Sequence, residues 1–174
     1  MQPCRLQAFF LDRSGVAAVE FGLIAPLFVL ALGVAVDCAL VYRTKLRLIS
    51  AASAASVYVA KQAGSITESK VSTIIENASE AAAFVAQMPS LKTTVLFNNA
   101  PTSINFSNYY CVSGSSPETW SWSSTGSTRG SCGTTKASKY VSIVVEATSS
   151  TFFTPPTVAA RLTKVRDYVI VDVE

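Results

Sequence analysis

Histidine is missing from the 174 residues of this chain, which excludes imidazole as a general base, proton shuttle or metal ligand. Serine and cysteine nucleophiles that depend on a histidine are excluded with it. The sequence also lacks a Cys-x-x-Cys metal spacing, a phosphate-binding loop and a nucleophile elbow. We therefore expect a protein that is not an enzyme and that has no catalytic residues, no metal site and no cofactor.

Charge is scarce as well. Charged side chains make up 14% of the chain and hydrophobic ones 49%, which is too apolar for a disordered tail and low in charge for a soluble domain. The formal net charge is only +3, no five basic residues follow one another, and basic residues do not alternate with aromatic ones. We expect no nucleic-acid partner. One membrane segment and one domain of roughly 110 residues account for this composition.

A long apolar run lies near the N-terminus. Gly22 to Val36 contains no charged residue, and the stretch from Val16 to Val36 would measure about 31 Å as a helix, which matches the hydrocarbon core of a bilayer. Pro26 removes one backbone hydrogen bond, which a membrane helix tolerates with a mild kink. Weaker apolarity continues to Tyr42. The run therefore predicts a membrane-spanning helix.

A carboxylate lies at the mouth of this run, in Gly15-Val-Ala-Ala-Val-Glu20-Phe21, and a charge at that depth is costly unless it is paired. If the chain were cut after Gly15, the new amine of Val16 would be largely cationic at neutral pH. Glu20 lies one helical turn away at i+4, on the same face of the helix. Pairing with an amine recovers much of the cost of the carboxylate. The alternative interpretation leaves Glu20 in the headgroup layer, with its oxygens reaching water.

Other processing routes stay open. Gly33-Val-Ala35 offers small residues where a signal peptidase could cut after an apolar region, although Glu20 would then interrupt that region without purpose. A lipoprotein site at Cys38 is disfavoured, because Asp37 occupies a position that needs a small neutral residue. An uncleaved anchor is the third route. Cleavage after Gly15 accounts for the glycine and the glutamate together.

The glycine, the glutamate and the aromatic residue after it resemble the processing site of type IV prepilins, in which a peptidase cuts after the glycine. The run Ala18-Val-Glu-Phe-Gly-Leu23, followed by Pro26, is similar to the N-terminus of TadE-like pseudopilins from tight-adherence (Tad/Flp) pilus systems. Ser50-Ala-Ala-Ser-Ala-Ala-Ser56 resembles the segment that follows the membrane helix in that family. Gly22 replaces a commoner alanine. The resemblance is confined to this N-terminal part, and a TadF-like sibling stays hard to distinguish.

This resemblance implies a minor pseudopilin or pilus-assembly protein that acts in pilus biogenesis and surface adhesion. It implies cleavage by a prepilin peptidase at a site made of Gly15, Val16, Glu20 and Phe21, with Glu20 fixing the register between subunits. Its partners would be that peptidase, other pilins or pseudopilins, the inner-membrane assembly platform and membrane lipid. The competing interpretation is a membrane-anchored extracytoplasmic binding domain unrelated to pili.

The expected location is the bacterial inner membrane, crossed once, with the C-terminal domain in the periplasm. Flanking charges do not support this orientation, because Arg43, Lys45 and Arg47 follow the apolar run and the positive-inside count leans the other way. The short leader, a cysteine pair in the C-terminal region and the resemblance decide it. A second charge, Asp37, lies near the membrane interface at the C-terminal end of the apolar run, where we expect water to solvate its carboxylate. The predicted parts are a leader over 1–15, a transmembrane helix over 16–42 and an extracytoplasmic domain over 43–174.

The C-terminal domain reads as α+β, with a second helix and a small antiparallel sheet. The first helix should continue from Tyr42 to Ala63 and end at Gly64. A capping-box pattern at Ser65–Glu68 predicts a second helix to about Met88. The buried face predicted for the first helix is Leu46, Ile49, Ala52, Ala55, Val59 and Ala63. Strands are predicted at 93–97, 103–112, 119–122, 140–147 and 167–173, with a turn or short helix over 154–162.

Two cysteines fall in a polar part of the C-terminal region that is rich in Ser, Gly and Thr. A bond between Cys111 and Cys132 would close a loop worth about 3 kcal/mol on the chain-entropy estimate, provided that the domain lies in an oxidising compartment. Two unpaired thiols are the alternative for a cytosolic domain. Trp120 and Trp122 lie within the loop, and they serve either as a contact patch or as packing against the core.

Overall fold

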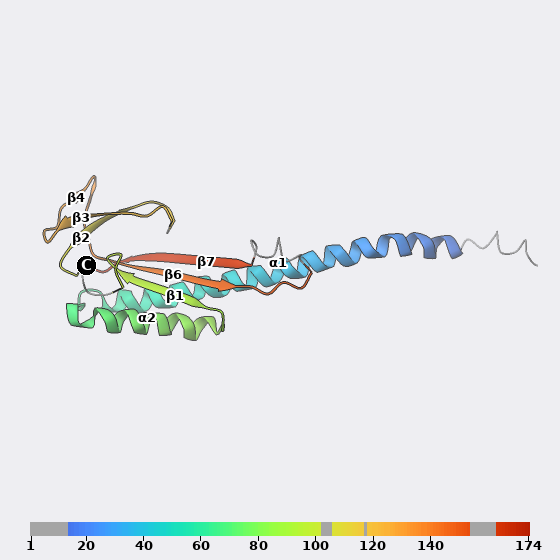
Figure 1. Ribbon diagram of the computed structural model, residues 1–174, viewed down its shortest axis with the longest axis horizontal. Coiled ribbons are helices and arrows are strands. Elements are labelled where there is room, and N and C mark those ends of the chain that lie inside the picture. The colour runs from blue at the N-terminus through green and yellow to red at the C-terminus, as the bar shows by residue number, and fades with distance from the viewer. Residues whose placement is uncertain (1–13, 102–105, 117, 154–162) are drawn as a thin grey trace, which may run out of the picture.

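The computed structural model describes residues 14–101, 106–116, 118–153 and 163–174. Its first helix, α1 (Ser14–Gln62), is continuous through Pro26. The N-terminal part of α1 projects as a bare shaft from a domain built by the rest of α1 and the later elements, so the molecule has the outline of a lollipop (Figure 1). Most of the predicted leader, and the turn or helix predicted over 154–162, lie outside the described residues.

The domain is α+β, which confirms the predicted class. The C-terminal half of α1 and the second helix α2 lie side by side and pack on one face of a three-stranded antiparallel sheet of order β1-β6-β7 (Figure 1). Two short antiparallel ladders, β2–β3 and β4–β5, lie at the end of the domain away from the shaft. After α1 the elements are a short 3-10 helix (Glu68–Lys70), α2 (Val71–Ala86), β1 (Lys92–Phe97), β2 (Tyr109–Ser113), β3 (Ser121–Gly126), β4 (Ser131–Cys132), β5 (Thr135–Lys136), β6 (Tyr140–Thr148) and β7 (Lys164–Asp172).

The end of α1 follows its sequence signal, whereas the start of α2 does not. Gly64 has a φ of +78°, a left-handed conformation that glycine adopts without steric cost. The predicted capping box is wrong, because the hydroxyl of Ser65 donates backwards to the carbonyl of Gln62 at 2.8 Å. The chain then forms the short 3-10 helix before α2 begins at Val71. One hydroxyl can satisfy either helix end, and here it serves the end of α1.

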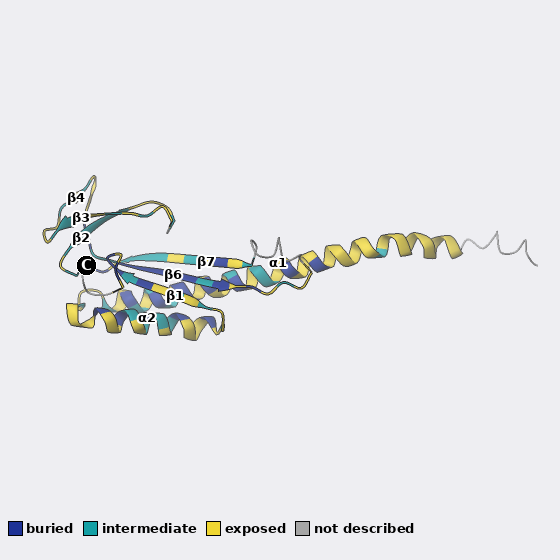
Figure 2. Ribbon diagram, viewed as in Figure 1, coloured by how far each residue is buried: buried dark blue, intermediate teal, exposed yellow. Residues whose placement is uncertain are grey.

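One of the two strands with the densest β-branched composition, β6, forms the centre of the sheet, and the other, β7, forms an edge. β6 pairs with β1 on one side and with β7 on the other, both antiparallel. Its inward side chains Val141, Ile143 and Val145 are fully buried against the helices (Figure 2). The strands predicted at 140–147 and 167–173 are confirmed with small shifts of their ends, and the β4–β5 hairpin was not predicted.

The buried face of α1 differs from the predicted one. Leu48 and Ala51 are fully buried, whereas Leu46 and Ile49 are 46% and 45% exposed. The helix is apolar around most of its circumference, so spacing alone could not identify the face that packs. Ala52, Ala55 and Val59 are buried as predicted.

The Trp-bearing hairpin β2–β3 covers part of the outer face of the sheet. Trp122 makes edge-to-face contacts with Tyr110 of β2 and Tyr140 of β6, at centroid distances of 6.2 and 6.4 Å. Trp120 meets Tyr168 of β7 at 5.5 Å in the same geometry. Burial, with a smaller contribution from the carboxylate of Asp172, raises the pKa of Tyr140. Both tryptophans therefore pack the hairpin onto the sheet.

The predicted bond between the cysteines is present. Cys111 of β2 and Cys132 of β4 form a disulfide with their Cα atoms 5.6 Å apart. The bond ties the β4–β5 hairpin to the β2–β3 hairpin. Cys38 is free and exposed on α1.

Candidate assembly surface and membrane-proximal site

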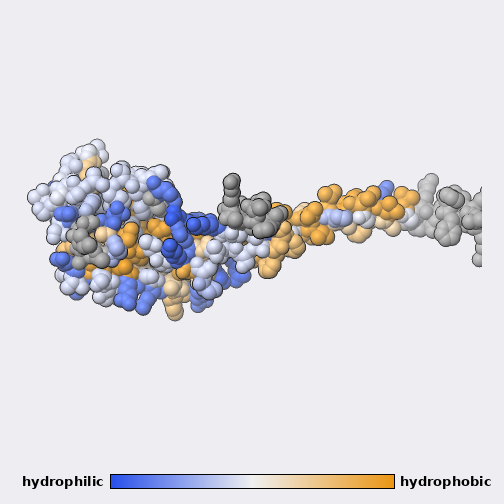
Figure 3. All heavy atoms as spheres, in the orientation of Figure 1, coloured by the Kyte–Doolittle hydropathy of each residue, from blue (hydrophilic) through white to orange (hydrophobic). Residues whose placement is uncertain are grey.

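The first half of α1 has an uncovered apolar surface. Between Val16 and Val36 every residue is exposed except Ala25, which is half-buried, and Gly33, which is buried. Figure 3 shows this stretch as a hydrophobic shaft next to a largely polar domain surface. By length and composition the helix could span a membrane. An apolar surface of this size needs lipid or other helices to cover it.

The residues of the predicted processing site lie in the first two turns of this shaft. Val16, Glu20 and Phe21 are exposed, and a Cβ added at Gly15 would meet no atom within 4 Å. Val16 and Glu20 are separated by one helical turn, as the sequence predicted. Within the described residues, no hydrogen bond or ion pair reaches Glu20. The carboxylate is therefore available to a partner outside this chain.

The carboxylate of Asp37 lies at the other end of the shaft. The expectation that solvent explains this charge is wrong, because the residue is only 3% exposed. Its two oxygens accept hydrogen bonds from the backbone N–H groups of Phe152 and Phe153, at 2.8 and 3.0 Å. These groups belong to the segment that follows β6, so the bonds tie that segment to α1. Hydrogen bonds from N–H groups replace the water that a buried carboxylate loses.

A glycine on α1 makes room for this attachment. A Cβ at Gly33 would lie 2.7 Å from the Cγ atom of Phe153, far inside van der Waals contact. Gly33 and Asp37 are one turn apart on the same face, so the phenyl ring and the two hydrogen bonds act together. Sequence reasoning missed this site because its partners are more than a hundred residues apart, as the separations of 115 and 116 show. No local pattern at Asp37 identifies them.

The part of the chain that the structure describes has no candidate metal centre. No group of three or more His, Cys, Asp or Glu side chains is placed there to hold a metal ion. The surface thus consists of an apolar helix with one carboxylate near its start and a second one buried at its far end.

Fold and surface together define a protein with a single N-terminal helix able to anchor it in a membrane and an α+β domain at the other end of that helix. Residues 15–56 match the model of the TadE-like protein family, which confirms the resemblance over that segment. The match begins at Gly15 and covers the whole exposed shaft. It indicates a role in a Tad pilus system, together with pilus components. Comparisons with curated proteins and with solved structures find no match.

Proposed function

We propose that this protein is a minor pseudopilin or assembly protein of a Tad/Flp-type pilus, acting without catalysis in pilus biogenesis and in surface adhesion. The observation that carries the proposal is the exposed carboxylate of Glu20, which has no partner among the described residues, in the apolar shaft that matches the TadE-like model. Soluble domains do not need such a carboxylate, and a simple anchor would be more stable without it. The contribution to adhesion rests on the family resemblance alone.

Cleavage after Gly15 by a prepilin peptidase would create a cationic partner for Glu20. The amine of Val16 would be cationic, and a neighbouring subunit could offer its own amine to the same carboxylate. In lipid, an unpaired charge is expensive, so subunits would associate at the axial offset that pairs amine with carboxylate. Glu20 would then set the register of a head-to-tail helical assembly.

A second exposed stripe on α1 supports packing against other helices. Tyr42, Leu46, Ile49 and Val57 are all at least 45% exposed and lie on the part of α1 that follows the shaft. These side chains extend the apolar surface beyond the expected membrane boundary. Neighbouring pilins or pseudopilins would cover the stripe during assembly at the inner-membrane platform.

The contact between α1 and the segment after β6 favours retention of the shaft. Signal-peptidase cleavage after Ala35 would remove Gly33, whose lack of a side chain admits the ring of Phe153. Retention with a cut after Gly15 keeps this contact and frees the amine of Val16. We propose a location in the bacterial inner membrane with the domain on the periplasmic side, where the Cys111–Cys132 bond is stable.

Determination of the mature N-terminus tests this proposal. The protein should begin at Val16 when isolated from membranes that contain the prepilin peptidase, and should keep Gly15 when the peptidase is absent. A start near Val36 or a retained Met1 in both membranes would refute it. If the protein kept its anchor uncleaved and cells that lack the protein still formed normal pili, the membrane-anchored binding domain would be favoured.

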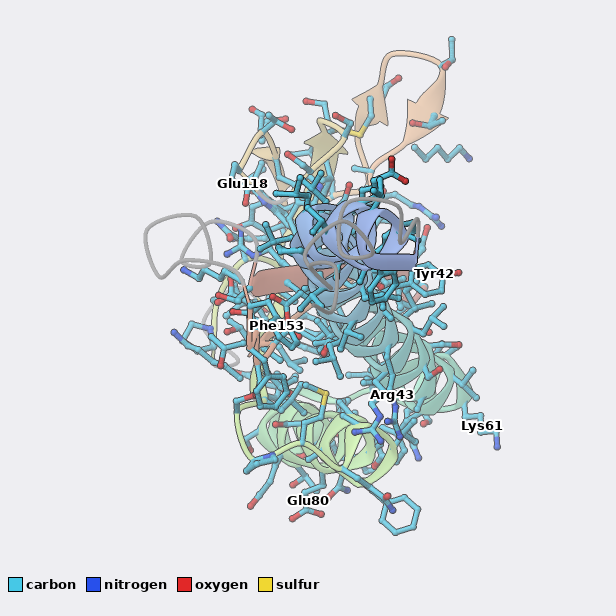
Figure 4. All side chains as sticks on the ribbon, turned by 90° about the vertical axis from the view of Figure 1, so that its right-hand side faces the viewer. Tyr42, Arg43, Lys61, Glu80, Glu118 and Phe153 are labelled. Carbon is cyan, nitrogen blue, oxygen red and sulfur yellow. A yellow bond between two sulfur atoms is a disulfide. The ribbon has the colours of Figure 1, made fainter. Side chains whose placement is uncertain are left out.

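Variants at the site separate processing from assembly. Gly15→Ala should slow cleavage, whereas Glu20→Gln and Glu20→Ala should leave membrane insertion intact and reduce pilus assembly. Glu80→Gln is the matched control, because Glu80 is an exposed glutamate on α2, at a distance from the shaft (Figure 4). Normal piliation in all three site variants would contradict the proposed roles.

A further inference from the structure

A cleft lies at the edge of the domain that faces the shaft. Its volume is about 360 Å³, and its walls come from α1, from the turn after α2 and from the segment after β6. Leu40 and Phe152 line it together with Arg43 and Arg47. Its size falls within the range of small-ligand sites. The cleft thus combines apolar and cationic side chains next to the expected membrane surface.

The two arginines carry unpaired charge. Arg43 and Arg47 are one helical turn apart and both are exposed. In the described part of the chain, neither takes part in a hydrogen bond or an ion pair. Figure 4 looks along α1 from its N-terminal end and shows Arg43 on the side of α1 that faces α2. Two guanidinium groups over one cleft form a site for an anion, and phosphate oxygens match their geometry.

The height of the cleft matches the headgroup layer. If the hydrocarbon core ends near Val36, Leu40 lies about 6 Å, Arg43 about 10 Å and Arg47 about 16 Å above it along the helix. The headgroup layer on each side of a bilayer is about 5–8 Å thick. Side chains on a helix lean toward its N-terminus, so both arginines incline toward the membrane. The guanidinium group of Arg43 can therefore reach the layer in which lipid phosphates lie, and that of Arg47, one turn higher, can approach the outer edge of this layer.

The apolar part of the cleft continues into the shaft. Phe152 is 76% exposed, although its own N–H is bound to the carboxylate of Asp37 and cannot move freely. Phe153 is 57% exposed and packs on Gly33, one turn below Asp37. Two exposed phenyl groups, whose backbone N–H groups are bound to Asp37, adjoin at this level the surface of α1 that lipid would cover. An acyl chain could run from the cleft along Leu40 and Phe152 to the shaft.

We propose that this cleft binds one anionic phospholipid of the adjacent leaflet, with its phosphate held by Arg43 and Arg47 and its acyl chain against Leu40 and Phe152. The proposal rests on the membrane anchoring described above. A bound headgroup would fix the height and tilt of the domain over the bilayer. Asp37 serves as a positioning residue, because it holds the segment that carries Phe152.

Lipid binding by the full chain tests the proposal. The protein, purified in a neutral detergent, is titrated with phosphatidylglycerol, phosphatidylcholine or inorganic phosphate, and bound lipid is counted by native mass spectrometry. One phosphatidylglycerol should bind per chain, more tightly than either alternative. Arg43→Gln with Arg47→Gln should weaken it about thirtyfold, since each basic residue near a membrane surface contributes about 1 kcal/mol.

Lys61→Gln with Lys70→Gln is the matched control, because it removes the same charge from exposed positions at the far end of α1 and before α2. This control should bind lipid as the unchanged protein does. Phe152→Ser should weaken the binding of phosphatidylglycerol and leave the binding of inorganic phosphate unchanged.

Three outcomes would overturn the proposal. Equal binding of inorganic phosphate and lipid would indicate a site for a free anion, and an equal loss of lipid binding in the lysine control would indicate general charge attraction. The third outcome is unchanged lipid binding in the arginine variant. The mature N-terminus and membrane retention are measured on the same samples. These two measurements report on the proposed function alone, so that its failure can be distinguished from a failure of the lipid-binding proposal.

Discussion

The ammonium group of Lys45 lies 2.7 Å from Oδ1 of Asp167 and 2.6 Å from the backbone carbonyl oxygen of Arg166, across a separation of 122 residues to the aspartate. The pair joins α1 to β7 two turns beyond Asp37. Together, the hydrogen bonds of Asp37 and this ion pair attach α1 to the segment after β6 and to β7. The domain and the helix are therefore expected to move as one body.

Lys45→Met should lower the free energy of unfolding by about 1 kcal/mol, because Asp167 would lose the ammonium group that it binds. The effect is small because the pair is partly exposed and solvent screens it. The methionine retains the apolar stem of the lysine. Thermal unfolding of the full chain in detergent measures the effect. Lys61→Met is the control, since Lys61 is exposed near the end of α1 and forms no ion pair within the described residues. Equal effects of the two changes would remove Lys45 from this role.

Loss of the disulfide should loosen the two hairpins while the layer of helices and sheet stays folded. Replacing both Cys111 and Cys132 by serine removes a loop constraint worth about 3 kcal/mol in the chain-entropy model. Proteolysis should then cut between β2 and β6 before it cuts α1 or α2. Cys38→Ser is the control, because that thiol is free and exposed. Resistance of the double variant to proteolysis would show that aromatic packing alone holds the hairpins.

Trp122→Ala should lower the stability of the hairpin by about 2 kcal/mol, because the ring contacts two tyrosines. The loss is smaller than for a fully buried aromatic residue, because the ring is only half-buried. The effect is expected in the near-ultraviolet circular dichroism and in hairpin proteolysis. Phe84→Ala offers a comparison, since Phe84 is 79% exposed on α2 and its removal should change stability little. If Trp122→Ala left both measurements unchanged, the tryptophan would be free to serve as a contact patch.

Local signals predicted the elements well, and they could not predict how the elements pack. Gly64 marks the end of α1 because only its own backbone conformation is required there. The strand at β6 follows from its β-branched composition. Asp37 is different, since the two N–H groups that it binds come from a distant segment whose position depends on the whole sheet. The site at the cleft was missed for the same reason.

The face of α1 that packs could not be read from spacing either. Alanines and leucines surround the helix, so a face that includes Leu46 and Ile49 has nearly the same periodicity as one that includes Leu48 and Ala51. What selects the second face is contact with β7 and with α2, to which Lys45 and the small alanines contribute. The first face is left for other helices.

Two leucines of α1 test this assignment directly. Leu48 is fully buried, whereas Leu46 is 46% exposed two positions earlier. Leu48→Ala should reduce the free energy of unfolding by about 3 kcal/mol, because it leaves a cavity that the packed helices and sheet cannot fill. Leu46→Ala should cost less than about 1 kcal/mol, since the side chain gains little from folding of the isolated subunit.

Denaturant unfolding of both variants in the same detergent decides between the two faces. The predicted order is a large loss for Leu48→Ala and a small one for Leu46→Ala, whereas the face expected from sequence alone requires the reverse. Assembly provides a second measurement. Leu46→Ala should reduce association with other pilus subunits while the subunit stays stable, because Leu46 belongs to the exposed stripe with Tyr42, Ile49 and Val57. A stable Leu46→Ala protein that assembles normally would remove the stripe from the subunit contact and leave Glu20 to act alone.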